Sequence, residues 1–256
     1  MKRIGDITAK LKEKPYIYRI ELLDRFYKIL ENKEIVFVRP STWLDPLENL
    51  IFNAQIIKNG TPYIHPVKDS IYSQCWSTEG DSYALWQIYT TKKNDKGEFN
   101  RHFGVRITTR IDKLKHFSQL NENSFYYGQM EYLWKYQLEA LPKNLRILKA
   151  LKKPTLKIEH LKTLLVKRKS YHYEHELRLF GIPNPSQIDT NNNDVCRFKI
   201  EPTELITSVR FDPAIPYPEF RTKKEELIDE YGFKPRQITQ STYLKKNKFK
   251  IDITGK

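Results

Sequence analysis

Two glutamates and an arginine alternate in the C-terminal half of the chain, at Glu174, Glu176 and Arg178. If residues 171–180 form a strand, all three side chains lie on one face, because side chains alternate along a strand. Neighbouring carboxylates repel each other, which raises the pKa of at least one of them unless a cation such as Arg178 intervenes. Such a cluster suits acid–base chemistry or the polarisation of a substrate hydroxyl. A solvent-exposed face with a cross-strand ion pair is the structural alternative.

A second candidate is the dense run at residues 40–48, between a predicted strand and a predicted helix. Asp45 precedes Pro46, which predicts a short helix that is capped by Asp45 and opens at Pro46. Glu48 then favours the first helical turn electrostatically. Alternatively, Glu48 faces a cleft as a functional carboxylate.

The third candidate is an aromatic pair, Trp86 and Tyr89, on a helix that we expect Asp81 or Ser82 to cap. Aromatic residues three positions apart on a helix are typical of a core. Arg106 is more unusual, because it lies among β-branched residues of a predicted strand. A charge in that position must find a partner.

Several common chemistries have no support in the sequence. The chain has nine glycines, and none forms a dinucleotide-binding fingerprint or a P-loop. There is no C-x-x-C or H-E-x-x-H motif, so a zinc site has no support in the sequence. His172 and His175 would point to opposite faces of a strand, so we interpret them as surface histidines on an edge. Cys75 precedes a tryptophan at a strand end and is expected to pack in the interior.

The pattern of apolar residues predicts an α+β fold in a single domain that spans residues 1–256. Helices are expected at 21–33 and 217–232, and residues 135–169 form a mostly helical basic insertion that is broken at Pro142 and Pro154. Strands are expected at 34–38, 71–76, 103–108, 125–133, 171–180, 195–200 and 206–211.

The charge of the chain is strongly positive and unevenly placed. The formal net charge is +14, and the stretch 143–169 holds ten Lys or Arg residues against Glu159 alone. A second cluster comprises Lys245, Lys246, Lys248 and Lys250. Clustered positive charge attracts polyanions by releasing their counterions, so we expect a nucleic-acid partner. Solvated helix faces in a lysine-rich protein are the alternative.

The location of the protein follows from what the sequence lacks. No apolar run approaches the ~20 residues that a bilayer span needs, so we expect no membrane contact. The first residues carry no apolar segment of the kind found in secretory signals. The chain has two cysteines, too few for a disulfide framework. These features favour a reducing cytoplasm.

In the order of its short motifs the chain resembles bacterial domain-of-unknown-function family 2971, whose name implies no activity. The resemblance spans nearly the whole chain, with two departures. Leu44 replaces the family's usual asparagine, and the insertion at 92–101 lengthens the interval between Tyr89 and Gly104. The matching residues are Tyr18-Arg19, Pro40, Trp43, Asp45-Pro46, Glu48, Cys75, Ser77, Leu85-Trp86, Tyr89, Gly104–Ile107, Tyr173-Glu174-x-Glu176-x-Arg178, Asp212-Pro213 and Ser241.

A fainter resemblance is to mono-ADP-ribosyltransferases of the Arg–Ser–Glu type. Those enzymes use an arginine on an early strand, a Ser-Thr strand end and an E-x-E pair, and here Arg19, Ser77-Thr78 and Glu174-x-Glu176 follow in that order. The resemblance implies a split mixed or antiparallel sheet flanked by helices, which holds NAD as substrate without a glycine-rich loop.

The same resemblance implies a role for each residue. Arg19, beside Tyr18, would hold the phosphates or the ribose of NAD, and Trp86 and Tyr89 would wall the nicotinamide pocket. Ser77 would orient the carboxylate of Glu176, which stabilises positive charge on the ribose as nicotinamide leaves. Glu174 would position or deprotonate the acceptor, with Arg178 completing the catalytic set.

The leading hypothesis is therefore an NAD-dependent ADP-ribosyltransferase-like enzyme, such as a bacterial toxin or phage-defence effector that modifies nucleic acid or protein. A toxin implies an antitoxin or another regulatory protein. One alternative is a nuclease in which Asp45, Glu48, Glu174 and Glu176 bind Mg²⁺. Another is a non-catalytic module in which lysines and arginines bind nucleic acid.

Overall fold

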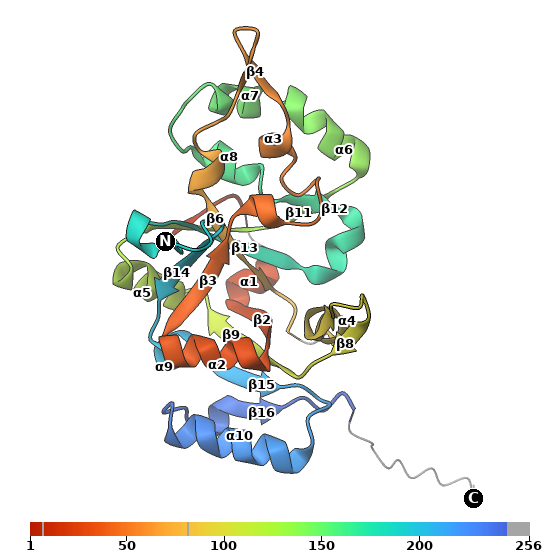
Figure 1. Ribbon diagram of the computed structural model, residues 1–256, viewed down its shortest axis with the longest axis vertical. Helices are drawn as coiled ribbons and strands as arrows, with labels where there is room; N and C mark the ends of the chain where they lie inside the picture. Colours follow the sequence, from red (N-terminus) through yellow and green to blue (C-terminus); the bar gives the residue numbers. More distant parts are fainter. Residues whose placement is uncertain (7, 81, 245–256) are drawn as a thin grey trace, which may run out of the picture.

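The computed structural model describes residues 1–6, 8–80 and 82–244, and it mixes helices with one large mixed sheet in a single compact fold (Figure 1). The main path of the sheet runs in the order β1-β10-β13-β6-β2-β9-β15-β16, and β3 pairs with both β6 and β14. Its strands are β1 (Lys2–Arg3), β2 (Tyr16–Leu22), β3 (Glu34–Val38), β6 (Tyr72–Ser77), β9 (Gly104–Arg110), β10 (Ser124–Gln129), β13 (Glu176–Ile182), β14 (Val195–Lys199), β15 (Ser208–Phe211) and β16 (Ile238–Gln240).

The sheet divides between β2 and β6. These antiparallel strands are joined by one residue pair in the described part of the chain, Tyr18 opposite Ser77. Beyond that pair the strands separate, and the Arg19 guanidinium crosses the gap to donate from Nη1 to the carbonyl oxygen of Cys75 (2.6 Å). The side-chain bond replaces backbone pairing there and leaves space between the two halves of the sheet.

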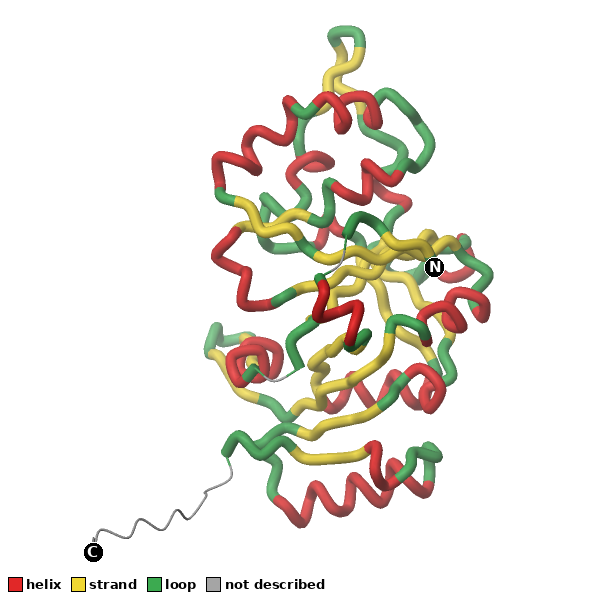
Figure 2. The backbone as a smooth tube through the Cα atoms, turned by 180° about the vertical axis from the view of Figure 1, so that it is seen from behind, coloured by secondary structure: helices red, strands yellow, loops and turns green. Residues whose placement is uncertain are grey.

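Helices flank the large sheet (Figure 2), and the larger apolar core takes residues from strands on both sides of the division. In α2, Phe26, Ile29 and Leu30 form the buried stripe that its spacing predicted. Four phenylalanines interlock at the centre of this core, with ring centroids 4.6 Å apart for Phe117 and Phe125. The helices are α1 (Ala9–Glu13), α2 (Leu23–Asn32), α4 (Tyr83–Thr90), α5 (Lys113–Leu120), α9 (Pro202–Leu205) and α10 (Tyr217–Asp229).

A second group of elements gathers at the end of the molecule opposite α10, around a smaller core (Figure 1). It brings residues near 50–70 together with the expected insertion, and Phe52, Leu161 and Leu164 share its apolar centre. Its elements are α3 (Leu50–Asn53), the hairpin β4 (Ile56–Lys58) and β5 (Thr61–Tyr63), β11 (Glu131–Leu133), α6 (Lys135–Ala140), α7 (Leu145–Leu151), α8 (Ile158–Lys162) and β12 (Val166–Arg168). A further small hairpin pairs β7 (Thr91–Lys93) with β8 (Phe99–Arg101).

Several local predictions are confirmed. The strand at 34–38 matches β3 in its bounds, and α4 is capped by Ser82, whose hydroxyl accepts a hydrogen bond from the Leu85 amide. The breaks expected at Pro142 and Pro154 separate α6, α7 and α8. The alternative cap Asp81 and the basic cluster at Lys245, Lys246, Lys248 and Lys250 lie outside the described residues.

The helix expected from Pro46 is wrong, because α3 begins only at Leu50. Asp45 accepts a hydrogen bond from the Leu47 amide (3.0 Å) in a turn, and its carboxylate pairs with Arg168. The competing ion pair holds the segment in turns before the helix starts.

The strand expected over 171–180 is wrong in its first half. Residues Lys169–Glu174 form a 3₁₀ helix, and His175 has a left-handed backbone (φ 44°) that turns the chain into β13. His172 and His175 therefore do not lie on opposite faces, since their ring centroids are 4.9 Å apart. The end of the expected helical insertion is also different, because Val166–Arg168 is the strand β12.

Candidate functional site

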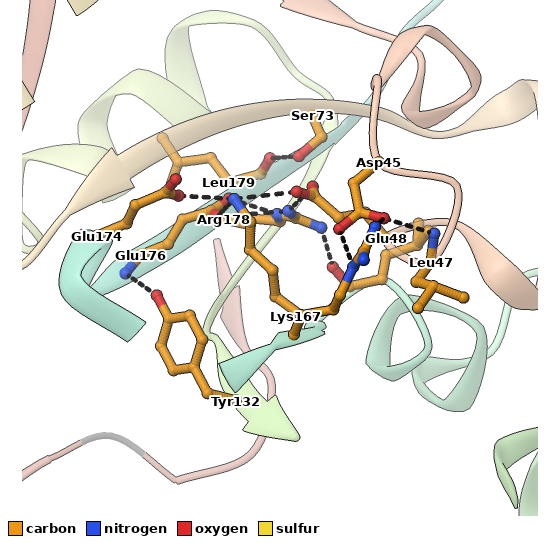
Figure 3. Close-up of polar contacts among 12 residues, drawn as sticks. Asp45, Leu47, Glu48, Ser73, Tyr132, Lys167, Glu174, Glu176, Arg178 and Leu179 are labelled. Atoms are coloured by element: carbon orange, nitrogen blue, oxygen red, sulfur yellow. Dashed lines mark hydrogen bonds and ion pairs between the residues drawn. The ribbon is translucent and has the colours of Figure 1, made fainter. Parts of the chain in front are cut away.

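Five charged side chains from four parts of the chain meet beside the division of the sheet (Figure 3). They are Glu48 before α3, Lys167 on β12, Glu174 at the end of the 3₁₀ helix, and Glu176 and Arg178 on β13. All are buried: Glu176 is 2% exposed and Arg178 is fully enclosed. Charges are rarely buried unless they are paired, and here each one is.

Arg178 is fixed by bonds along its whole guanidinium. Nε donates to Glu176 Oε1 (2.5 Å), Nη2 to Glu48 Oε2 (2.5 Å) and Nη1 to the Leu164 carbonyl oxygen (2.6 Å). The ring of Trp43 covers its face, with the Arg178 Cζ 3.9 Å from the ring centroid. These contacts hold the Arg178 guanidinium and the Glu176 carboxylate in fixed positions.

Lys167 joins the same carboxylates from the opposite side. Its Nζ lies 2.6 Å from Glu174, 3.0 Å from Glu48 and 3.1 Å from Glu176. Burial alone would lower the pKa of Lys167, but the three glutamates raise it, so the ammonium stays charged. The expectation that Lys167 belongs to a nucleic-acid-binding surface is therefore wrong.

The cluster carries an excess of negative charge among its described members, with three glutamates against Lys167 and Arg178. Burial would raise the pKa of Glu176, but Arg178 and Lys167 outweigh burial and hold it at about 2. Burial raises the pKa of Glu174 above its ordinary value despite the bond from Lys167. The cluster thus contains one carboxylate that remains ionised and one that exchanges a proton more readily.

A cavity of about 230 Å³ opens between β2, β6 and α4. Glu174 and Glu176 form one wall of it. The other residues singled out from the sequence for the NAD site also line it, namely Tyr18, Arg19, Ser77, Trp86 and Tyr89. Arg178 contacts this cavity through Glu176 and is not part of its described lining.

The cavity is lined by aromatic and charged side chains together, with Tyr18, Trp86 and Tyr89 among the aromatic ones. Trp86 is buried, whereas Tyr89 is partly exposed, and burial followed by the charge of Glu174 raises the pKa of its phenol. Tyr18 packs against Gly80, where a Cβ would meet the ring at 2.6 Å. The Arg106 guanidinium lies over the Tyr18 ring, 4.9 Å from its centroid, and donates to the Gly80 carbonyl. Arg106 has thus found the partners that its position required.

Arg19 and Ser77 line the cavity, and both form hydrogen bonds with other protein groups. Arg19 pairs with Glu21 (2.5 Å) as well as with the Cys75 carbonyl, and its side chain is one-quarter exposed. The Ser77 hydroxyl donates to the Glu174 carbonyl oxygen (2.7 Å) and accepts from the Glu79 amide (2.9 Å). We expected the Ser77 hydroxyl to contact the Glu176 carboxylate. These two hydrogen bonds of the hydroxyl are instead with backbone groups, those of Glu174 and Glu79.

The sequence interpretation missed Lys167 and Tyr132. Lys167 was counted within a basic run, although the apolar residues before it, Leu164 to Val166, carry the signal of a buried strand. The Tyr132 hydroxyl accepts a hydrogen bond from the Glu176 amide (2.7 Å) and pins the start of β13. Glu48, assigned mainly to a helix turn, is an integral part of the cluster.

The carboxylates are arranged for protein cations. Asp45 pairs with Arg168 (2.6 Å), and Glu48, Glu174 and Glu176 are engaged by Lys167 and Arg178. Within the described ranges, no group of three or more His, Cys, Asp or Glu side chains is placed to hold a metal ion. A Mg²⁺ site at these carboxylates would require the ion pairs to break.

Comparison of the chain with protein-family models, with curated proteins and with solved structures found no match. Among the described helices, none has both the length and the apolar character needed to cross a membrane.

Proposed function

We propose that this protein is an ADP-ribosyltransferase-like enzyme that consumes NAD in the cavity between β2 and β6. The observation that carries the proposal is the lining of that cavity. Aromatic side chains, Arg19 and two glutamates, chosen from motifs far apart in the sequence, surround one space. The resemblance to the Arg–Ser–Glu transferases and to family 2971 belongs to the same proposal, as does the split-sheet fold of those transferases.

The excess negative charge suits the reaction. When the bond between the ribose C1′ and the nicotinamide nitrogen breaks, the electron pair leaves with nicotinamide and positive charge develops on the ribose. Glu176, ionised and immobilised by Arg178, stabilises that charge without having to reorganise. The nucleophilic group of the acceptor then bonds to C1′, and Glu174 takes the proton that this group loses.

The size of the cavity matches one end of the substrate. Pockets for whole drug-sized ligands span about 300–1,000 Å³, whereas this one is about 230 Å³. That volume suits the nicotinamide and its ribose, with Trp86 and Tyr89 in the wall of the pocket and the phosphates near Arg19. The adenosine end would lie outside the cavity.

A bacterial toxin or defence effector controlled by an antitoxin or another regulatory protein is the biological setting of this proposal. A reducing cytoplasm fits it, because Cys75 and Cys196 are both free thiols.

The experiment that tests the proposal is release of nicotinamide from NAD labelled in that ring, with chelator or with Mg²⁺. Release that is insensitive to chelator supports the transferase. Absence of release and of NAD binding by calorimetry, with chelator-sensitive cleavage of RNA or DNA, would replace it by the nuclease alternative.

The pH dependence of the reaction should report Glu174. A base must be deprotonated to act, so activity is expected to rise with pH through the raised pKa of Glu174. Glu176, with its pKa at about 2, stays ionised across this range and contributes no such limb. We expect Glu174→Gln to lower the rate and to remove the acid limb from the pH profile of kcat. An unchanged acid limb in that variant would assign the titration to another group.

A further inference from the structure

A second hollow lies immediately behind the acidic segment. It has a volume of about 910 Å³, and its lining includes Thr78 and His175. Their neighbours in the chain, Ser77, Glu174 and Glu176, line the first cavity instead. The amide and hydroxyl of Thr78 both donate to the His175 carbonyl oxygen, so these two residues are joined in one layer. Residues adjacent in the chain therefore line one hollow or the other.

A row of aromatic rings leads from this hollow to the acidic strand. The ring centroids of Tyr132 and His172 are 5.0 Å apart, and those of His172 and His175 are 4.9 Å apart, both edge to face. Tyr132 is also bonded through its hydroxyl to the Glu176 amide. The row therefore ends at the residue to which the proposed chemistry is assigned.

Further large aromatic side chains are exposed on the segments that carry this row. Trp134 lies two residues beyond Tyr132 and is 53% exposed, and Tyr136 in the first turn of α6 is 68% exposed. Tyr173, on the same 3₁₀ helix as His172, is 44% exposed. Clusters of exposed aromatics mark interaction sites, whereas single ones are ordinary. We refer to Tyr132, Trp134, Tyr136, His172 and Tyr173 as the aromatic platform.

Positive charge accompanies these rings. The Lys169 ammonium lies over the Trp134 ring, 4.6 Å from its centroid, and Lys135 and Lys162 are exposed beside the platform and the hollow. Amide and carboxylate groups of Gln129, Glu131 and Asp6 also line the hollow. Cations suit a phosphate backbone, and the polar groups can bond to base edges.

We propose that the second hollow and the aromatic platform bind single-stranded nucleic acid, with unpaired bases stacked on the rings. Proteins commonly bind single strands by stacking the bases on aromatic side chains beside cations that contact the backbone, and here Lys135, Lys162 and Lys169 supply the cations. A duplex hides its base faces and would bind more weakly. That this nucleic acid is the acceptor of ADP-ribose rests on the proposed function; the binding itself does not.

Tryptophan fluorescence tests the contact directly. Trp76 and Trp86 are buried and Trp43 is stacked on Arg178, so Trp134 is the tryptophan placed to meet a base. Titration with single-stranded oligonucleotides of mixed sequence should quench its emission. Trp134→Phe should remove the quench while retaining binding by anisotropy. Binding with no quench in the unaltered protein would overturn the proposal.

Affinity measurements supply the second test, with fluorescein-labelled RNA, DNA and duplex arms of one sequence. We expect Trp134→Ala to weaken single-strand binding about tenfold. The control Tyr217→Ala removes a similarly exposed aromatic from α10, at the far end of the molecule, and should change nothing (Figure 1). The RNA and DNA arms identify which single strand is preferred. Equal affinity for the duplex, or an unchanged affinity in Trp134→Ala, would contradict the assignment.

The two proposals fail separately, because binding is measured without NAD and is repeated with Glu176→Gln. Nicotinamide release without single-strand binding would overturn this inference and leave the proposed function in place. Platform-dependent binding by a protein that never releases nicotinamide would support this inference and overturn the proposed function.

Discussion

Replacement of Arg178 by methionine is expected to lower the free energy of unfolding by about 3–5 kcal/mol, the usual cost of breaking a buried ion pair from one side. Arg178 is fully buried between Glu48 and Glu176. Methionine fills much of the space but leaves both carboxylates without their main cation. Urea denaturation followed by circular dichroism measures the change.

The origin of this loss can be isolated by a double-mutant cycle with Glu48→Gln. If uncompensated charge causes the loss, neutralising Glu48 should cost less in the Arg178→Met background than in the unaltered protein. Arg221→Met removes an exposed arginine paired with Glu225 on α10 and should have little effect. A loss for Arg178→Met as small as that for Arg221→Met would show that the cluster does not stabilise the fold.

Replacement of Glu176 by glutamine is expected to reduce nicotinamide release by about 10²–10³-fold, the typical effect of removing one preorganised electrostatic group. Glutamine keeps the shape and one oxygen acceptor, but it loses the charge that faces the developing positive ribose. The effect should appear in kcat, because the interaction forms in the transition state. Single-turnover release of labelled nicotinamide measures it.

Glu48→Gln is the matched control for this variant. It removes the same charge from the same cluster, but Glu48 is outside the described lining of the cavity. We expect it to alter stability while costing much less activity than Glu176→Gln. Equal losses of activity in the two variants would assign the effect to the stability of the cluster and not to chemistry at Glu176.

The sequence predicts much of the fold because local patterns dominate in many of its elements. β3 and α2 follow from alternating and helical apolar spacing, and Ser82 from its capping chemistry. The 3₁₀ helix before β13 was missed because its residues alternate as those of a strand do. The turn depends on the left-handed backbone conformation of His175, which cannot be predicted from the residue type.

The candidate site was predictable in its membership but not in its connections. Glu176 and Arg178 do share one strand face, and Glu174 joins them through Lys167 after a turn. Glu48 lies 130 residues from Arg178, and no local pattern reports such a contact. Lys167 looked like one more surface cation because composition does not distinguish a buried lysine from an exposed one.

The measurement that tests the central claim most directly is nicotinamide release from labelled NAD, comparing the unaltered protein with Glu176→Gln and Glu48→Gln at matched folded fractions. The account predicts release by the unaltered protein, substantial release by Glu48→Gln and almost none by Glu176→Gln. Full release by folded Glu176→Gln would contradict the account, because the Glu176 carboxylate in the wall of the cavity would then have no part in the reaction.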